Sequence, residues 1–366
     1  TLQPHHLFYE ICKKKGVKIF MLNHANWKKL CYISEQRHHI DSINSNDIVK
    51  ETNVNFTELQ NLLKNSKISK FHQKFHDETK NSKFFLIRAA LKFLFSSNDN
   101  SKSHYTYFGR TKFNVLYNEI LDKIKKIKRQ KFIDQNLLQK IEKNTSFIYM
   151  PLHQEPERSL LIAAPKFSNQ LETINEIAKS LPENFQLYVK EHPIQILRGW
   201  RSKEEYQEIM DIPNVRLLHP DFSNDILYNN CSLVFTIAGT AGFEAACYGK
   251  PSIIMVKLNY LDLPSVTLLN NFNELNDLIK NKLKEKVSAN DVSEFLNLFK
   301  TNASNFDWGG FTQKLSEEFF KNKTRDAQIS NKKMESFLKE NDQILEDFAE
   351  EHFKKIQLFE QEESSK

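Results

Sequence analysis

Three polar segments of the chain each follow a short apolar, β-rich run, and the first of them is "PLHQEPE". It places His153, Gln154, Glu155 and Glu157 directly after "SFIYM", with Pro156 holding the backbone off a helix. An imidazole and carboxylates in one loop can move a proton to or from a hydroxyl group. A polar turn with a helix-capping Glu is the alternative interpretation, and both stay open at this point.

The second polar segment is "VKEHP", at the end of "FQLYV". Pro193 disfavours the helical region for the preceding residue, so His192 is held in extended backbone beside Lys190 and Glu191. His and Lys at a strand end can hold a phosphate or a nucleobase carbonyl, while Glu191 can orient the ring or act as a base. The His-Pro pair recurs at His219, for which we favour a structural or solvent-facing role.

The third segment explains where the chain uses its few glycines, because three of the eight lie within "TIAGTAGFEAACYGKPSII", residues 236–254. A helix is predicted to begin right after "SLVFTI", and a Gly-rich turn at its start lets the backbone approach a phosphate, which the helix dipole favours. Tight packing of the turn is the alternative. The nucleotide interpretation assigns a hydroxyl donor to Thr240 and a ribose acceptor to Glu244, with Gly239, Ala241 and Gly242 forming the turn.

These segments lie in a stretch of alternating strand and helix signals, residues 146–320. The runs "SFIYMPL", "FQLYVKE", "NVRLL", "SLVFTI" and "PSIIMV" read as strands, separated by helical patterns such as "NQLETINEIAKSL". Gly249 is predicted to end the helix that precedes "PSIIMV". Such alternation predicts a parallel, doubly wound sheet, and ligands bind beyond the carboxyl ends of its strands. We therefore expect His153, His192 and Gly239 at one edge of the sheet.

The flanking regions have a different pattern. Residues 1–145 begin with a helical segment to Lys15-Gly16 and a strand-like "VKIFML", which form half of a βαβ unit whose first strand would precede Thr1. The basic run "LDKIKKIKRQKFI" follows later, and it is predicted to be a solvated helix face or a contact with an anionic membrane. Residues 321–366 are predicted to form one or two amphipathic helices and a frayed tail.

Composition excludes several classes of protein. The 52 basic and 46 acidic residues leave a formal net charge of +6, which argues against a dedicated nucleic-acid binder. The four cysteines have neither CxxC nor zinc-ligand spacing, which favours reduced thiols in a cytoplasmic protein. The sequence printed contains no apolar run of membrane-spanning length, and its first residues do not predict a signal peptide.

The segments "PLHQEPE", "LPENFQLYVKEHP", "IPNVRLLHP" and "FTIAGTAGFEAACYGKPSI" resemble, in order and spacing, the capsule polysaccharide biosynthesis proteins, which include bacterial Kdo transferases. The resemblance implies an α/β, GT-B-like fold with two Rossmann-like domains facing across a cleft and extra C-terminal helices. Residues 1–145 would then form the acceptor-side domain, residues 146–320 the nucleotide-sugar-binding domain, and residues 321–366 the additional helices.

The resemblance also implies an activity, the transfer of a Kdo- or sialic-acid-like sugar from a CMP-activated donor to a glycan or lipid-linked acceptor. His192 and Pro193 match the His-Pro element that contacts CMP, with Lys190 beside it. The catalytic carboxylate is expected from the loop of His153, Gln154, Glu155 and Glu157, with Glu191 as a further candidate, and the donor nucleotide is expected at Gly239, Thr240, Ala241, Gly242 and Glu244. No DxD-type metal signature lies near these loops, so neither metal nor cofactor is expected.

Three other functions share parts of this pattern. A teichoic-acid glycerophosphotransferase would also carry His-Pro after a strand, but it would need a different turn in place of "AGTAGFE". A sugar-nucleotide 2-epimerase shares the fold and needs no acceptor. A non-catalytic nucleotide-sugar-binding scaffold would use the basic stretch and the C-terminal helices for docking.

Overall fold

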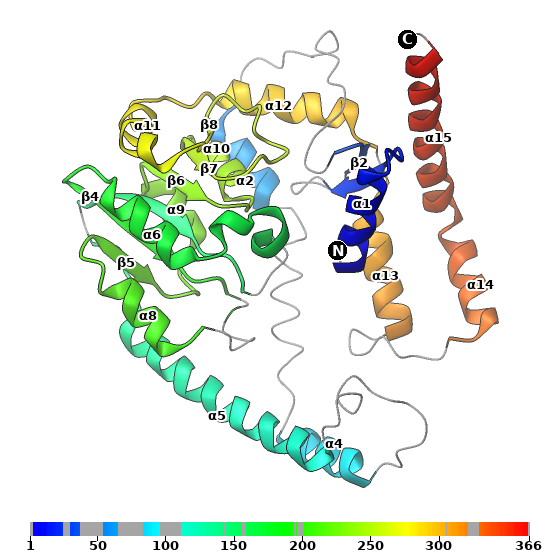
Figure 1. Ribbon diagram of the computed structural model, residues 1–366, viewed down its shortest axis with the longest axis horizontal. Coiled ribbons are helices and arrows are strands. Elements are labelled where there is room, and N and C mark those ends of the chain that lie inside the picture. Colours follow the sequence, from blue (N-terminus) through cyan, green and yellow to red (C-terminus); the bar gives the residue numbers. More distant parts are fainter. Residues whose placement is uncertain are drawn as a thin grey trace. The chain divides into compact units, whose positions relative to one another are not determined.

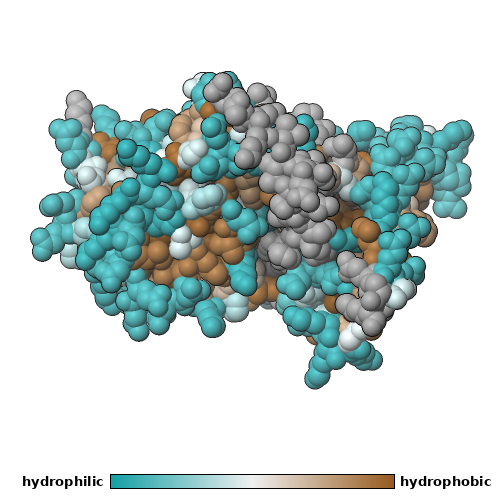
Figure 2. Space-filling model, turned by 90° about the horizontal axis from the view of Figure 1, so that it is seen from above, coloured by the Kyte–Doolittle hydropathy of each residue, from teal (hydrophilic) through white to brown (hydrophobic). Residues whose placement is uncertain are grey.

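The computed structural model describes residues 3–24, 30–36, 54–64, 83–95, 111–142, 144–155, 159–193, 195, 201–304, 306–320 and 329–364. The chain forms two compact units (Figure 1). We call residues 64–256 and 268–286 the α/β unit, and residues 1–63, 257–267 and 287–366 the helical unit. Hydrophilic residues cover much of the face seen in Figure 2, and an apolar area is visible on the side of the α/β unit.

The larger sheet has six strands in the order β5-β4-β3-β6-β7-β8. The strands are β3 (Ser146–Pro151), β4 (Phe185–Lys190), β5 (Val215–Leu218), β6 (Leu233–Thr236), β7 (Ser252–Ile254) and β8 (Val266–Leu268). The pairs β3–β4, β4–β5, β3–β6 and β6–β7 are all parallel, as the alternation of strand and helix signals predicts. The first five strands lie where the sequence places them, and β8 is an addition.

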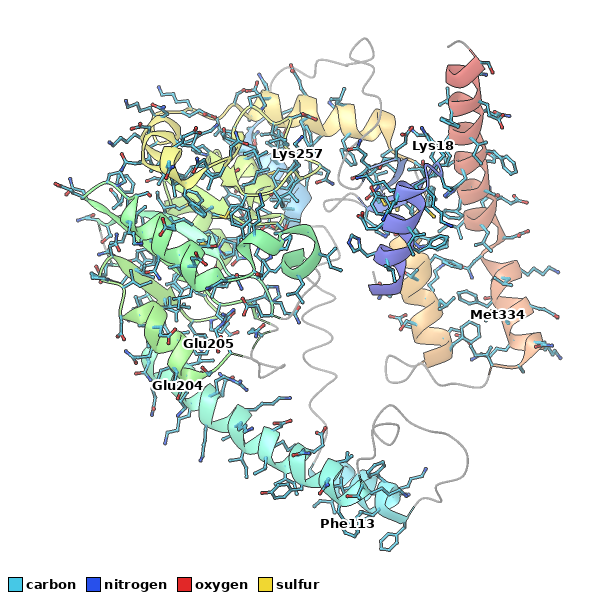
Figure 3. All side chains as sticks on the ribbon, in the orientation of Figure 1. Lys18, Phe113, Glu204, Glu205, Lys257 and Met334 are labelled. Carbon is cyan, nitrogen blue, oxygen red and sulfur yellow. The ribbon has the colours of Figure 1, made fainter. Side chains whose placement is uncertain are left out.

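Among the described residues, five helices lie between or after these strands, and side chains cap the first three of them. They are α6 (Gln170–Lys179), α8 (Lys203–Met210), α9 (Asn224–Asn230), α10 (Ala241–Cys247) and α11 (Leu275–Lys282), with short turns at Ser159–Ala163, Pro165–Phe167 and Phe272–Glu274. Asn169 caps α6 and Ser223 caps α9, while Ser202 forms a reciprocal capping box with Glu205 at the start of α8 (Figure 3).

The core of the α/β unit follows the period-two alternation of the strands. Ile148 and Met150 of β3 pack with Leu187 and Val189 of β4 in one cluster, which also contains Ile174 of α6 and residues of α8 and α11. The opposite face of the sheet is aromatic. Phe147 of β3 packs on Tyr188 of β4, Tyr149 of β3 on Tyr228 of α9, and Tyr228 on Tyr248. The sheet is therefore covered on both faces, which a parallel sheet requires.

Two further helices precede this sheet within the α/β unit. They are α4 (Lys83–Phe95) and the long α5 (Lys112–Asn136), which contains the basic run predicted to be a helix face. The carboxyl end of α5 joins β5, because Leu138 N–H donates to Leu217 O and His219 N–H donates to Leu138 O. His219 strengthens this junction, since its Nε2 lies 3.1 Å from Asp134 Oδ1. The structural role favoured for His219 fits these contacts.

The helical unit has a different construction from the α/β unit. It contains α1 (Gln3–Lys14), β1 (Met21–His24), β2 (Cys31–Ser34), α2 (Phe56–Lys64, whose last residue falls in the α/β unit), α12 (Ala289–Asn302), α13 (Trp308–Phe320), α14 (Asn331–Glu340) and α15 (Asp342–Ser364). Its strands β1 and β2 form an antiparallel pair, and β2 was not predicted from the sequence. The strand begins at Met21, later than "VKIFML" suggests.

The C-terminal helices pack within this unit, as the apolar spacing of residues 321–366 predicts. Phe311 and Phe319 of α13 and Phe337 of α14 form a small core, and Phe348 of α15 stacks on Trp308 at 4.7 Å between ring centroids. The α/β fold class with extra C-terminal helices is thus confirmed. The domain boundaries at residues 145 and 320, and the Rossmann-like character of residues 1–145, stay predictions.

Candidate active site

The candidate site lies at the carboxyl edge of the sheet, where the direction of strand succession reverses. From β3 the chain proceeds outward to β4 and β5, and it then returns to β6 on the other side of β3. Loops that leave adjacent strands toward opposite sides open a crevice, and ligands of doubly wound sheets bind there. The segments after β3, β4 and β6 carry His153, His192 and Gly239, so the sequence prediction that one edge holds all three is confirmed.

His153 joins the loops after β3 and β6, which lie on the two sides of the switch point. Its ring atom Nε2 accepts a hydrogen bond of 3.2 Å from the backbone N–H of Ala238, in the loop after β6. Its own backbone is fixed by Gln170 of α6, whose Oε1 accepts from His153 N–H at 2.7 Å and whose Nε2 donates to His153 O at 3.0 Å. The loop after β3 is therefore held from both sides of the crevice.

The protonation state of His153 follows from this position. Burial, with a further contribution from nearby His192, lowers the pKa of His153 to about 4. The ring is neutral near pH 7, and because Nε2 accepts a hydrogen bond, the proton resides on Nδ1. His153 thus provides alignment of the two loops at neutral pH, and its Nε2 lone pair is already in use.

Gly239 packs directly on the His153 ring. A Cβ atom at this position would lie 3.3 Å from His153 Cε1 and only 2.9 Å from Thr236 Oγ1. The same hydroxyl oxygen accepts a hydrogen bond of 3.1 Å from Gly239 N–H. The absence of a side chain at residue 239 is thus a requirement of the close approach between the two loops.

Glu155 is the exposed carboxylate of the site, with 27% of its side chain accessible. Gln195 clamps its backbone, accepting from Glu155 N–H at 2.8 Å and donating to Glu155 O at 3.1 Å. Its side chain accepts from Gln170 Nε2 through Oε1, and Arg201 Nη1 lies 3.5 Å from Oε2. A partly exposed carboxylate held this firmly at the edge of the sheet can accept a proton from a bound hydroxyl group.

Glu191 occupies a different position from the one its sequence context suggests. Its side chain is completely buried, and it accepts from His192 N–H at 2.6 Å through Oε1 and from Arg201 Nε at 2.6 Å through Oε2. Burial opposes the charge of Arg201, but Glu191 and Glu155 outweigh it and raise the pKa of the guanidinium. Glu191 is therefore built as a positioning group for His192 and Arg201, away from any position where a substrate could touch it.

Lys190 supplies a buried amino group on the aromatic side of the sheet. Only 6% of the residue is exposed, and its Nζ donates to Asn224 Oδ1 at the start of α9. Burial lowers the pKa of Lys190 to about 8, although Asp221 and Glu244 act in the opposite direction. The amino group is thus mostly charged at neutral pH and suited to an anionic ligand.

The turn into α10 is organised by Glu244. Thr240 Oγ1 donates to Glu244 Oε1 at 2.6 Å, and the Tyr228 hydroxyl donates to Oε2 at 2.8 Å. These bonds commit the hydroxyl proton of Thr240, which the sequence assigned to a ligand. Ala241 and Gly242 are both buried, and Gly242 O accepts from Ser252 Oγ of β7, so these two residues pack the helix on the sheet.

The helix α10 ends as predicted at Gly249, which has a positive φ of 71°. Gly249 N–H donates to Ala246 O at 3.0 Å and Lys250 N–H donates to Ala245 O at 2.9 Å, the two bonds of a Schellman motif. This cap turns the chain directly into β7. Its role is structural, as expected from the sequence.

The remaining predicted residues have less defined positions. Gln154 is buried, His192 is half-buried and Pro193 is exposed at the same edge of the sheet. Glu157 lies outside the described residues, so its role stays a prediction. Among the residues that the structure describes, no three His, Cys, Asp or Glu side chains are grouped so that they could hold a metal ion.

Sequence reasoning did not identify the groups that hold the site together. Gln170, Gln195 and Arg201 are each at least 96% buried, and together they contact Glu155 and Glu191. Gln170 follows a capping Asn and Arg201 precedes a capping Ser, and these local signals indicate helix starts only. The supporting role of a buried Gln or Arg can be recognised only from the residues that it contacts. Because these residues are distant in the sequence, the role could not be predicted.

A doubly wound parallel sheet with polar loops at its switch point defines an α/β protein of the ligand-binding, Rossmann-like type. The chain belongs to the capsule polysaccharide biosynthesis protein family, whose model matches residues 43–302 and includes every predicted site residue. The resemblance stated from the sequence motifs is confirmed by this match. No curated protein sequence matches the chain.

Several solved structures are similar to part of the chain. A UDP-GlcNAc 2-epimerase from Methanocaldococcus jannaschii is 14% identical, with a TM-score of 0.31, over 47% of this chain and 48% of its own. The Thermosulfurimonas dismutans KpsC beta Kdo 2,7 transferase is 18% identical, with a TM-score of 0.31, over 47% of this chain and 53% of its own. Anabaena Alr3699/HepE, solved with UDP-glucose, is 17% identical, with a TM-score of 0.31, over 54% of this chain and 53% of its own. The chain thus matches about half the length of each structure.

Proposed function

We propose that this protein is a glycosyltransferase of surface or capsular polysaccharide biosynthesis. It takes a Kdo- or sialic-acid-like sugar from a CMP-activated donor and transfers it to a glycan or lipid-linked acceptor, acting in the cytoplasm. The observation that carries this proposal is the set of polar loops at the β3–β6 switch point, within the region that matches the capsule polysaccharide family. The accessible carboxylate of Glu155 and the buried cations of Lys190 and Arg201 are present at that edge.

The donor nucleotide occupies the loops after β4 and β6 in this proposal. His192 contacts the CMP group, and the backbone at Gly239 and Thr240 approaches the phosphate, where no side chain at residue 239 obstructs it. Lys190 offsets the negative charge that develops on the phosphate as the sugar leaves. Glu244 holds the turn in place through Thr240 and Tyr228.

The chemical step uses Glu155 as the base. The acceptor hydroxyl oxygen forms a bond to the anomeric carbon, the bond between that carbon and the phosphate oxygen breaks, and CMP leaves with the electron pair. The hydroxyl proton passes to the Glu155 carboxylate, which Gln170, Gln195 and Arg201 hold in position. Neither a metal nor a cofactor has a part in this proposal.

The test is to incubate the protein with CMP-Kdo, CMP-sialic acid or UDP-GlcNAc, with and without glycan acceptors, and to analyse the products by mass spectrometry. Acceptor-dependent release of CMP with a product of increased mass supports the proposal. Conversion of UDP-GlcNAc to its 2-epimer without acceptor would identify an epimerase, and binding without turnover would identify a scaffold. Repeating the assay with EDTA tests metal independence.

A further inference from the structure

Most of helix α5 extends away from the six-stranded sheet of the α/β unit (Figure 1). Its buried residues, Arg129 and Ile133, lie near its carboxyl end, where Arg129 Nη1 donates to Arg201 O. Between residues 117 and 128 every residue except Leu121 is exposed. Only the last turns of the helix are therefore packed on the sheet and its covering helices, and the turns from residue 117 to residue 128 are exposed on nearly all sides.

An apolar stripe runs along this projecting part of the helix. It is formed by Phe113, Tyr117, Ile120, Ile124 and Ile127, which are between 44% and 75% exposed. At 3.6 residues per turn these five positions fall within a sector of about 80°. Phe113 lies at the far end of the helix in Figure 3.

The stripe faces away from the six-stranded sheet and the helices that cover it. By the same helical geometry, the buried residues Arg129 and Ile133 lie about 160° to 200° around the helix from the centre of the stripe. Among the described residues, those of the sheet and its covering helices thus pack against one side of α5, and the apolar side stays exposed. Exposed apolar side chains gathered in this way mark an interaction surface.

Helix α4 extends this surface. It lies against α5, with Lys112 Nζ 5.8 Å from the ring centroid of Phe93, and its own Ile87, Leu91 and Phe95 are at least 50% exposed. These three follow each other at intervals of four residues, so they share one side of the helix. The helix contains no acidic residue.

The positions of the charged residues on α5 indicate which kind of partner binds the stripe. Lys123 and Lys128 border the stripe on its two sides, while Asp122 and Glu119 lie on the opposite side of the helix. Lysines beside an apolar stripe can bury their stems and reach anionic headgroups. A second copy of this chain would instead bring like charges together, which opposes association along the stripe.

We infer that the surface formed by α4 and α5 docks on an anionic lipid bilayer, with α5 lying in the plane of the interface and its stripe directed into the headgroup region. None of the helices that the structure describes is long and apolar enough to cross a membrane, so this contact would be peripheral. The inference goes beyond the proposed function, because membrane contact requires neither donor nor acceptor.

The test is flotation of the full-length chain with phosphatidylcholine vesicles that contain or lack phosphatidylglycerol. We expect flotation with the anionic vesicles at low salt, weakened at high salt. The variant Tyr117→Gln/Ile120→Gln/Ile124→Gln should lose it, whereas Ile226→Gln, which changes an exposed isoleucine of α9, should retain it. The variants Lys123→Gln and Lys128→Gln should each weaken partitioning about fivefold, and together more strongly. Circular dichroism and size exclusion check that each variant folds.

The inference is overturned if the wild-type chain fails to float with anionic vesicles at low salt, or if the apolar triple variant floats like the wild type. It is also overturned if the triple variant converts a stable dimer into a monomer without a change in flotation, because the stripe would then join two copies. Lys126→Gln removes the same charge from the side opposite the stripe, so a loss equal to that of Lys128→Gln would show nonspecific attraction and contradict the docked orientation.

Discussion

The backbone N–H of Ala238 donates to Nε2 of His153 across 3.2 Å, and this bond links the loops on the two sides of the strand switch point. The bond exists only while the ring is neutral at Nε2, since a protonated imidazole has no acceptor. Protonation would therefore separate the loop that carries Glu155 from the loop that carries Gly239. The geometry of the candidate site depends on the titration of one buried histidine.

The first prediction concerns stability below neutral pH. Burial depresses the pKa of His153 to about 4 in the folded chain, whereas an unfolded histidine titrates near 6.5. As the pH falls below 6.5, the unfolded chain takes up a proton that the folded chain does not, so stability decreases until the pH reaches about 4. This residue alone should lower the free energy of unfolding by about 2 kcal/mol between about pH 7 and pH 5. Urea unfolding at a series of pH values measures it.

The matched variant for this prediction is His153→Gln, whose amide oxygen can accept from Ala238 N–H and does not titrate. Its stability should be lower than that of the wild type at neutral pH but less dependent on pH below it. Equal slopes for the two proteins between pH 7 and pH 5 would show that His153 is not the group responsible.

The second prediction tests the close approach at Gly239. In Gly239→Ala the new Cβ would lie 2.9 Å from Thr236 Oγ1 and 3.3 Å from the His153 ring, so the loop must shift. We expect a loss of about 1 to 3 kcal/mol in the free energy of unfolding. The affinity for CMP, measured by calorimetry, should fall as well, because this loop is the proposed phosphate contact.

The control for this substitution is Gly309→Ala in α13, where the nearest atom to a new Cβ is Asp307 Oδ1 at 3.7 Å. This is an ordinary contact distance, and alanine is a better helix former than glycine, so stability should stay equal or rise slightly. A Gly239→Ala protein as stable as Gly309→Ala, with unchanged CMP affinity, would remove the argument for a steric requirement.

The pattern of short apolar runs was sufficient to place five strands of the sheet, because a parallel sheet covered on both faces makes its strands nearly continuous in apolar residues. It also placed His153, His192 and Gly239 at one edge, since the carboxyl ends of parallel strands coincide. The strand β8 escaped because "VTL" is short and preceded by a polar loop.

The supporting groups could not be predicted in the same way. Arg201 lies ten residues from Glu191 and 46 residues from Glu155, and the periodicity of the helix and strand between them does not indicate which polar side chains will meet. The antiparallel pairing of β1 with β2 was missed for a related reason. Strand direction depends on the connection between strands, and the Lys- and Asn-rich sequence of that region carries no clear turn signal.

The third prediction concerns the buried pair of Glu191 and Arg201. Glu191→Gln would leave the Arg201 guanidinium buried beside an amide, and losing one partner of such a pair costs about 3 to 5 kcal/mol. Glu142→Gln is the matched control, because Glu142 lies 3.9 Å from Arg216 in an exposed ion pair that contributes less than about 1 kcal/mol. Urea unfolding compares the two. Equal stabilities of the two variants would mean that Glu191 is not held in a buried pair.

The fourth prediction concerns Lys190 at alkaline pH. If its amino group contacts the donor phosphate, CMP affinity should decrease by about tenfold per pH unit above its pKa of about 8, because the charge is lost. CMP itself does not change charge in this range, since its phosphate titrates near pH 6. In Lys190→Arg the charge persists, so affinity should be independent of pH in the same window. Calorimetry at a series of pH values measures the CMP affinity of both proteins. If the affinity changes with pH in the same way in both, the phosphate does not contact Lys190.

The last prediction separates binding from catalysis in the two polar loops. His192→Ala removes a contact made with the donor before and during reaction, so it should raise the Michaelis constant for the CMP-sugar or abolish CMP binding. Glu155→Gln keeps the shape of the side chain and one of its two acceptor oxygens but cannot take a proton, so it should keep donor affinity and lose turnover by about 100-fold or more. Glu183→Gln, an exposed carboxylate beyond the amino end of β4, is the matched control and should retain full activity. Initial rates and donor affinities of the three variants, each checked for folding, settle the assignment. Full turnover by Glu155→Gln would move the base to Glu157.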